Sequence, residues 1–228
     1  MINTFNSSVG KKIIVAVTGF LLLGFVVAHM LGNLQVFLGP EAINAYAMKL
    51  RSLGELLWVM RIGLLVVFVT HIVFAISVSN DNRSARPIGY TKSANIQSSY
   101  ASRFMVFSGL LILIYVIYHL AHFTLGVAHS EHFHYTDPEG NHDVYAMIIG
   151  SFQNPAVSAV YLAAMVALCF HLRQAAAAFP QTLGLLKSGG RELADKIGTA
   201  LALIIFLGFS AIPVAVLLGI LKMPEYIQ

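Results

Sequence analysis

Long stretches without a charged residue constrain this chain more than any other feature of its sequence. The five longest cover residues 13–40, 62–80, 104–130, 144–172 and 197–221. Each holds roughly the 20 mainly apolar residues that a helix needs to cross the hydrocarbon core of a bilayer. The chain is 57% hydrophobic and 11% charged, whereas soluble domains carry about a quarter charged residues. Alternating strand patterns are absent, so these runs predict an all-α integral membrane protein rather than a barrel.

We expect one membrane domain over residues 1–228, built as a bundle of five transmembrane helices. The spans are expected at about residues 12–37, 58–80, 103–127, 155–179 and 197–221. Pro155 is a good first residue for the fourth span, and Pro180 is expected to end it. In the first connector, residues 41–58, apolar positions recur at helical spacing, which predicts that it is partly helical.

Lys and Arg lie mainly on one side of the predicted spans. Ten of the 14 fall in segments on the same side as the N-terminus, and four fall on the other side. Because cytoplasmic segments carry the excess of Lys and Arg, the N-terminus is predicted to be cytoplasmic and the C-terminus outside. This topology explains the net charge of +4, so we expect no nucleic-acid partner.

Four of the spans carry a histidine deep in the apolar run: His29, His71, His119 and His171. An imidazole in lipid must find a partner, because hydrocarbon offers its nitrogens none. Counted from the predicted cytoplasmic end, His29 and His119 lie 17 and 16 residues in, and His71 and His171 lie 10 and 9 residues in. At about 1.5 Å per residue, these two levels are expected about 10 Å apart.

Two pairs of histidines at two depths predict two b-type haems. Neutral imidazole is a good axial ligand of haem iron, and two of them fill both axial positions. The expected pairs are His29 with His119, nearer the outside, and His71 with His171, nearer the cytoplasm. His122, one turn beyond His119, is a competing ligand at a slightly different depth. The alternative for each histidine is a structural hydrogen bond between helices.

Two other features bear on metal binding. Cys169 is the only cysteine, which excludes a Cys-ligated iron–sulfur cluster and covalent haem attachment through paired cysteines. The predicted external loop, residues 129–154, contains further histidines and acids: His129, Glu131, His132, His134, His142 and Asp143. Imidazole and carboxylate suit zinc or copper, but the spacing matches no fixed metal motif, so we expect a solvated polar loop.

The stretches around the four span histidines carry a family resemblance. They read AHMLGN, VTHIVFA, IYHLAHF and CFHLRQAAAAF. Together with the five spans, they resemble the di-haem cytochrome b membrane anchor of succinate dehydrogenases and fumarate reductases. The resemblance implies two haem b groups on these histidines, in the bacterial cytoplasmic membrane. It also implies a flavoprotein subunit and an iron–sulfur subunit on the cytoplasmic side, and a quinone, usually menaquinone, that reacts within the anchor. The anchor alone is not expected to be catalytic.

A quinone site needs hydrogen-bond donors at the quinone carbonyls and a route for protons. The candidates near the outer level and the first connector are Asn33, Gln35, Arg51 and Glu55, with Glu55 as the proton-transferring group. Candidates for binding the haem propionates are cations at the cytoplasmic span ends: Lys11, Arg103 and Arg173. The alternatives are an ordinary interfacial carboxylate at position 55 and cations that serve only membrane topology.

Two other functions remain open from the sequence. One is the cytochrome b anchor of a hydrogenase or formate dehydrogenase, which also links a soluble enzyme to quinone. The other is a transporter whose histidines line a polar path, for which we expect inverted repeats and more polar residues beside the histidines. The direction of catalysis, succinate oxidation or fumarate reduction, is not determined by the sequence.

Overall fold

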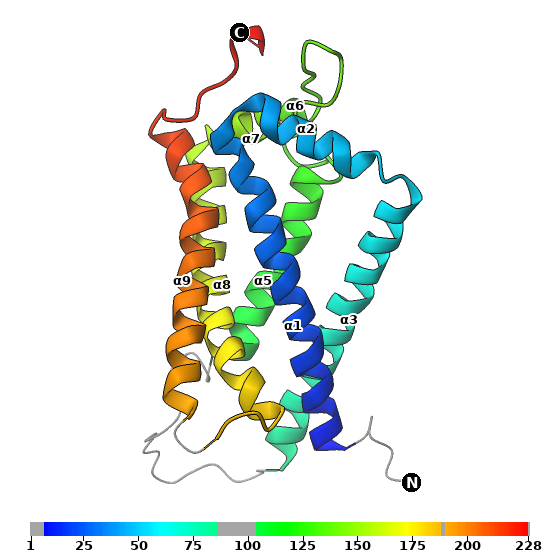
Figure 1. Cartoon of the computed structure of the whole chain (residues 1–228), viewed down its shortest axis with the longest axis vertical. Helices are drawn as coiled ribbons and strands as arrows, with labels where there is room; N and C mark the ends of the chain where they lie inside the picture. The colour runs from blue at the N-terminus through cyan, green and yellow to red at the C-terminus, as the bar shows by residue number, and fades with distance from the viewer. Residues whose placement is uncertain (1–6, 86–103, 188–189, 228) are drawn as a thin grey trace.

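A computed structural model describes residues 7–85, 104–187 and 190–227. This part of the chain is all-helical, and five of its helices are long and apolar enough to cross a membrane. These five are α1 (Ser8–Asn33), which a 3₁₀ turn η2 (Leu34–Leu38) extends, α3 (Glu55–Ser84), α5 (Met105–Phe123), α8 (Pro155–Thr182) and α9 (Gly190–Leu217). Consecutive spans run in opposite directions, so α1 begins at the lower end of the bundle and α9 ends at the upper end (Figure 1).

Short elements cover the upper end. These are α2 (Pro40–Arg51), α6 (Ser130–Phe133), α7 (Val144–Phe152) and the 3₁₀ turn η3 (Glu225–Ile227). Helix α2 lies across the top of the bundle (Figure 1), which confirms the prediction of a partly helical connector. The prediction of a solvated loop is wrong for α7, because its residues 145–152 are all buried. This segment is too short to span a bilayer, and it buries its apolar side chains against α8, α9 and α2 instead.

One buried carboxylate holds the upper elements together. Asp143 is fully buried and caps α7, since its Oδ1 accepts the Ala146 backbone N–H at 3.0 Å. The same oxygen accepts the Asn44 side-chain amide of α2 at 2.8 Å, and Oδ2 accepts the Tyr226 hydroxyl at 2.7 Å. A buried charge is tolerated when its acceptor sites are filled in this way. Asp143 therefore ties α2, α7 and the C-terminal segment to one another.

Several span ends differ from the sequence prediction for local reasons. Helix α3 begins at Glu55, directly after Gly54, whose φ of +54° favours glycine. Helix α9 ends at Leu217, because Gly219 adopts φ +69° and the Ile220 N–H returns to the Ala215 carbonyl at 2.9 Å. Helix α3 thus begins before the expected start at residue 58, whereas at α9 the uncharged run continues past the helix end to Leu221, so hydrophobicity alone misplaces both boundaries.

Pro180 does not end the fourth span. Helix α8 continues to Thr182, so Pro180 lies in its last turn. A proline there removes only one hydrogen bond near the helix end. The chain turns away just beyond, where the Leu185 N–H bonds to the Pro180 carbonyl at 2.9 Å and Gly184 has φ +69°.

The packed core lies on one side of the bundle. Buried residues of α7, α8 and α9 form one cluster with η2 and α2, and a second cluster joins Met30 of α1 to α8 and α9. Helix α3, in contrast, contains no buried residue. It contacts α1 at the lower end, where Lys11 Nζ lies 2.7 Å from Asp81 Oδ2, and diverges from α1 towards the upper end (Figure 1).

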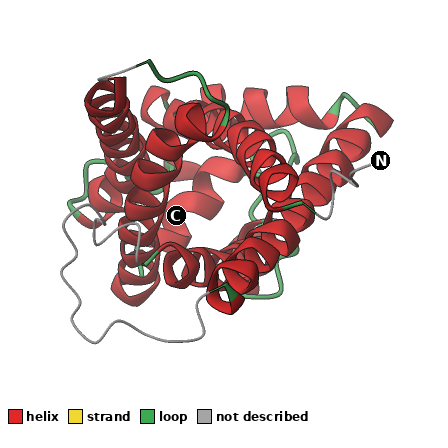
Figure 2. Cartoon of the chain, turned by 90° about the horizontal axis from the view of Figure 1, so that it is seen from below, coloured by secondary structure: helices red, strands yellow, loops and turns green. Residues whose placement is uncertain are grey.

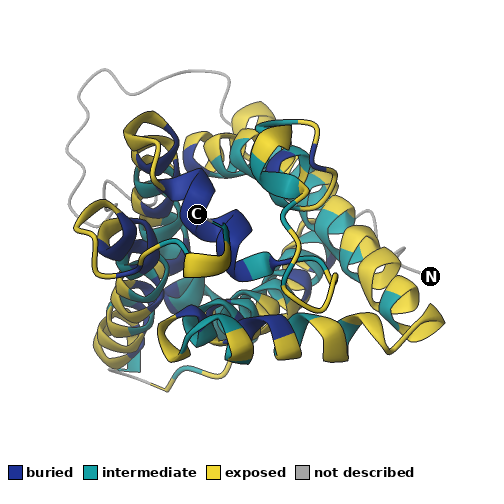
Figure 3. Cartoon of the chain, turned by 90° about the horizontal axis from the view of Figure 1, so that it is seen from above, coloured by how far each residue is buried: buried dark blue, intermediate teal, exposed yellow. Residues whose placement is uncertain are grey.

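Viewed along their axes, the helices stand in a ring (Figure 2). Buried residues concentrate at the upper end around α7, while the outward helix faces are exposed (Figure 3). Exposed apolar faces on five long helices suit a lipid surround. The four span histidines are all only partly buried.

Candidate functional site

The two lower histidines each contact a hydroxyl on a neighbouring helix. His71 of α3 has its Nδ1 3.1 Å from Thr18 Oγ1 of α1, and His171 of α8 has its Nδ1 3.1 Å from Ser108 Oγ of α5. Each hydroxyl has one hydrogen, and it already donates this hydrogen to a backbone carbonyl, at 2.7 Å for Thr18 and 3.0 Å for Ser108. With these hydrogens directed to the carbonyls, both hydroxyls accept from the histidine, and the hydrogen of each neutral ring lies on Nδ1.

This tautomer leaves the Nε2 lone pair of both rings available. The contacts that join the two rings to the hydroxyls of α1 and α5 are both made by Nδ1. A metal-binding histidine has the same arrangement, in which the second ring nitrogen donates to a fixed acceptor and so sets the tautomer and the ring orientation. His171 also lies within electrostatic range of His71.

A glycine next to each hydroxyl makes room for the ring. A Cβ on Gly19 would lie 3.1 Å from Cε1 of His71, and a Cβ on Gly109 would lie 3.5 Å from Cε1 of His171. A contact of 3.1 Å is tighter than ordinary packing, so Gly19 in particular permits the close approach of His71 to α1.

Helices α1 and α5 therefore carry the same pattern. A hydroxyl–glycine pair, Thr18-Gly19 or Ser108-Gly109, is followed 11 residues after the hydroxyl by a span histidine, His29 or His119. In each helix, the pair contacts a lower histidine and the span histidine belongs to the upper level. Eleven residues of helix rise about 16 Å. Measured along α1 and α5, the two levels are thus further apart than the 10 Å expected from the sequence.

The two upper histidines lie close together, as predicted from their depths. The ring centroids of His29 and His119 are 5.9 Å apart, and the ring planes are nearly perpendicular, at 82°. Aromatic rings surround the pair, with Phe25 stacked on His29 at 5.4 Å and Tyr115 5.7 Å from His119. The amide nitrogen of Asn33, a quinone candidate, lies 3.3 and 3.4 Å from the ring nitrogens of His29 and donates to its backbone carbonyl at 2.8 Å.

These distances fit a bis-histidine haem. Metal–imidazole bonds of about 2 Å on opposite faces of one iron place two ring centroids roughly 6 Å apart. The donor set at both levels is neutral imidazole, and apolar and aromatic side chains surround the upper pair, as an apolar macrocycle requires. The upper pair therefore fits one haem group, and the lower histidines offer the same donors for a second.

His122 has a different environment from the other span histidines. It is 2% exposed, and both of its ring nitrogens have protein partners, since Nδ1 lies 3.0 Å from Tyr161 Oη and Nε2 lies 3.0 Å from Ser151 Oγ. These partners are two separate hydroxyls on α8 and α7, whereas the ring nitrogens of His29 share one longer contact with the Asn33 amide. The geometry thus favours His119 over His122 as the ligand on α5.

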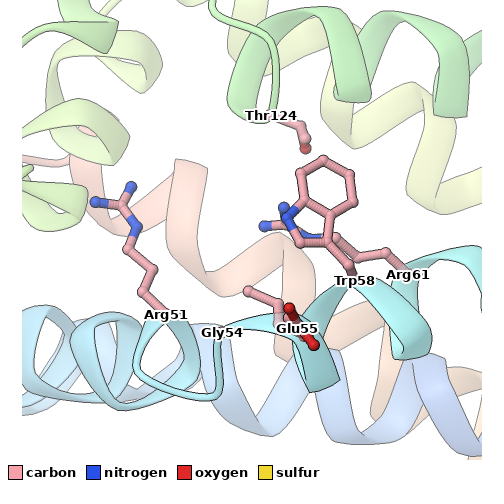
Figure 4. A pocket seen from close by; sticks show the side chains of 7 residues that line it. Arg51, Gly54, Glu55, Trp58, Arg61 and Thr124 are labelled. Atoms are coloured by element: carbon pink, nitrogen blue, oxygen red, sulfur yellow. The ribbon is translucent and has the colours of Figure 1, made fainter.

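The pocket at the upper end contains two of the quinone candidates. It has a volume of about 570 Å³, within the usual range for ligand sites, and is lined by Arg51, Gly54, Glu55, Leu57, Trp58, Arg61 and Thr124. Glu55, Trp58 and Arg61 come from the start of α3, and Thr124 faces them from the end of α5 (Figure 4). The Arg61 guanidinium lies over the Trp58 ring at 5.2 Å, while Arg51 stands apart at the end of α2 (Figure 4).

The remaining quinone and propionate candidates lie elsewhere. Gln35 is half-buried on η2 and does not line this pocket. Lys11 pairs with Asp81 at 2.7 Å, and Arg173 donates to Thr199 Oγ1 of α9 at 3.1 Å. Arg173 follows His171 by two residues, which places the two side chains on different sides of α8. Arg103 lies outside the described residues.

The histidine-rich loop forms local pairs at the upper end. Glu131 lies 3.7 Å from both His129 and His132. A backbone hydrogen bond lowers the pKa of the Glu131 carboxyl, and the two imidazoles lower this pKa further. Burial lowers the pKa of His142, and the nearby Arg51 lowers it further. Within the described ranges, no three His, Cys, Asp or Glu side chains come close enough to bind one metal ion.

Sequence reasoning missed the partners of the candidate ligands. A Thr or Ser in a transmembrane run is common, so Thr18, Ser108 and Ser151 carried no signal on their own. The signal that was present is the repeated spacing from a hydroxyl–glycine pair to a histidine.

Comparisons of the chain with protein-family models, with curated proteins and with solved structures found no match.

Proposed function

We propose that this chain is the membrane anchor and electron-transfer subunit of a succinate:quinone oxidoreductase. In this proposal it passes electrons between a cytoplasmic iron–sulfur subunit and a membrane quinone through two bis-histidine haem b groups. The observation that carries the proposal is the arrangement of four half-buried span histidines at two levels, with the lower rings fixed as Nδ1–H tautomers and the upper rings 5.9 Å apart.

The haem groups, when bound, supply reversible one-electron transfer without an open coordination position. The residues of this chain bind and orient them. Thr18 and Ser108 fix the lower imidazoles, and Gly19 and Gly109 admit these rings close to the helix backbones. In this proposal the subunit acts only within a complex.

The proposed orientation places the lower end in the cytoplasm and the upper end outside, in a bacterial cytoplasmic membrane. The excess of Lys and Arg on the side of the N-terminus supports it. The iron–sulfur subunit, with its flavoprotein partner, then docks at the lower end. Quinone, proposed to be menaquinone, reacts at the upper end, where the pocket at the start of α3 contains Glu55 beside Arg61 and Trp58.

An absorption spectrum and a haem assay of the purified membrane complex test the proposal. We expect two low-spin haem b groups per chain, together with flavin in the co-purifying subunits. His29→Ala and His119→Ala should remove the same haem, and His71→Ala and His171→Ala the other, whereas His134→Ala in the exposed loop should remove neither. A colourless protein would indicate a transporter instead. A nickel or molybdenum partner would indicate the anchor of a hydrogenase or formate dehydrogenase.

A further inference from the structure

A buried hydrogen-bonded chain leads away from the upper histidine His119. Its Nδ1 lies 3.4 Å from Tyr161 Oη of α8, which lies 3.0 Å from Nδ1 of His122. Nε2 of His122 in turn lies 3.0 Å from Ser151 Oγ of α7. Tyr161 is 5% exposed, His122 2% and Ser151 1%, so bulk water does not compete for these groups.

Metal binding by His119 fixes the direction of the first hydrogen bond in this chain, and pairing the Tyr161 hydroxyl hydrogen then sets the other two. If His119 binds iron through Nε2, its Nδ1 carries a hydrogen and donates it to Tyr161 Oη. The single hydroxyl hydrogen of Tyr161 is then free to be donated to Nδ1 of His122. With Nδ1 accepting, neutral His122 carries its hydrogen on Nε2 and donates it to Ser151. In the reverse order, Tyr161 Oη would accept from both imidazoles, and its own buried hydrogen would have no acceptor in this chain.

We propose that Tyr161 and His122 are positioning residues that orient the axial ligand His119 and lower the reduction potential of the upper haem. This inference rests on the proposed function. An acceptor for Nδ1–H makes an imidazole more basic, and successive hydrogen bonds in a dry interior strengthen one another. A more basic axial ligand stabilises ferric over ferrous iron, so this hydrogen-bonded chain lowers the reduction potential of the upper haem.

The described residues form no equivalent chain at the lower level. There the acceptors are Thr18 and Ser108, whose own hydrogens go to backbone carbonyls of the same helices. At the lower level the contacts therefore end at the backbone, whereas at the upper level Tyr161 leads on to a second imidazole, His122, one turn along α5. Changes at Tyr161 and His122 should therefore act on one haem and leave the other unaffected.

Redox titration of the purified complex, with electron paramagnetic resonance of the ferric haems, tests this inference. The upper haem is identified as the one lost in His119→Ala. We expect Tyr161→Phe to shift the midpoint potential of the upper haem to more positive values and to change its resonance, with the lower haem unchanged. The matched control is Tyr115→Phe, because the Tyr115 ring lies 5.7 Å from His119 but its hydroxyl makes no hydrogen bond to His119 among the described residues. This control should leave both potentials at their wild-type values.

A second pair of variants decides the matter if Tyr161→Phe does not assemble. His122→Leu removes the acceptor for the Tyr161 hydroxyl and should shift the upper potential in the same direction. His122→Gln offers a carbonyl to Tyr161 and an amide to Ser151, so it should restore the wild-type potential. Equal effects of Leu and Gln at position 122, or equal shifts of both haems, would overturn the positioning role. Absence of haem from the wild-type complex would instead overturn the proposed function.

Discussion

The hydroxyl oxygen of Ser108 lies 3.1 Å from Nδ1 of His171 and at the same time donates its only hydrogen to the Met105 carbonyl at 3.0 Å. This pair of contacts determines the tautomer of a candidate haem ligand from the protein alone, because an oxygen that has given away its hydrogen can only accept. Thr18 has the same relationship to His71, so both lower histidines are held by a hydroxyl in the same way.

The first prediction concerns these hydroxyls. Thr18→Val keeps the shape of the side chain but removes the acceptor for the Nδ1–H of His71. Loss of such a partner typically weakens metal binding about 10–100-fold, so we expect the lower haem to be lost more readily during purification. Thr199→Val is the matched control, since the Thr199 hydroxyl also donates to a backbone carbonyl, at 2.7 Å, but lies on α9 beside Arg173. Haem content per chain measures the difference, and equal haem loss in the two variants would contradict the prediction.

The second prediction concerns the glycine beside Thr18. A Cβ on Gly19 would already lie 3.1 Å from the His71 ring, whereas a Cβ on Gly24 has no neighbour within 4 Å. Gly19→Val should therefore displace the His71 ring and abolish binding of the lower haem, while Gly24→Val should retain both haems. The absorption spectrum of the two purified variants measures this. Retention of both haems in Gly19→Val would show that His71 does not need its present position.

The five spans and the four candidate ligands were predictable because each depends on a strong local signal. An uncharged run of about 20 residues has few folded alternatives to a transmembrane helix, and a histidine within it is rare enough to stand out. Helix ends were less predictable. They depend on glycines such as Gly54 and Gly219, whose positive φ is set by the turn and not by hydrophobicity.

Contacts between distant segments were not predictable from one sequence. The uncharged run over residues 144–172 merges the buried helix α7 with most of α8, and only the turn at Gln153–Asn154 separates them. Likewise, nothing in the local sequence marks Tyr161 as the partner of His119 and His122, since it lies some 40 residues further along the chain. Packing of helices decides such contacts.

The third prediction concerns the stability of the upper end. Tyr226→Phe removes the hydroxyl that donates to the buried carboxylate of Asp143 at 2.7 Å. A hydrogen bond to a charged group contributes about 1.5–3 kcal/mol, and we expect the lower part of this range because Tyr226 is 45% exposed. Thermal unfolding in detergent measures the loss. Tyr135→Phe, which removes a longer contact of 3.4 Å to His132, should have a smaller effect.

The same contact predicts a dependence on alkaline pH. Partial burial raises the pKa of Tyr226, and the hydrogen bond and charge of Asp143 raise it further. A group whose folded pKa is raised stabilises the fold fully below its unfolded pKa, which is about 10 for tyrosine, and this contribution is lost as the pH rises through the folded pKa. The difference in stability between the wild type and Tyr226→Phe should be constant at neutral pH and shrink only under strongly alkaline conditions.

The fourth prediction tests the upper pocket as the quinone site. Glu55→Gln removes a carboxylate that can exchange protons with quinone oxygens but keeps the size of the side chain. We expect quinone turnover to fall at least about tenfold, within the range of a lost acid–base group, with both haem spectra unchanged. Glu41→Gln is the matched control, because Glu41 lies in the first turn of α2 at the same end but does not line the pocket. Normal turnover in Glu55→Gln would exclude Glu55, and an inhibitor bound beside His71 and His171 would exclude the pocket.

The last prediction follows from the distance between the two haem levels. The levels are separated by 11 residues of α1, from Thr18 to His29, or about 16 Å along the helix. The hydrocarbon core is about 30 Å thick, so an electron that passes from the lower to the upper level crosses roughly half of it. A full crossing changes the free energy by about 2.3 kcal/mol per charge per 100 mV. The free energy of electron transfer between the two levels should change by about half of that amount. In proteoliposomes with an imposed potassium diffusion potential, the rate of succinate:quinone turnover should therefore change with the size and sign of the potential. A rate independent of the potential would place the quinone at the lower level, on the same side as the iron–sulfur subunit.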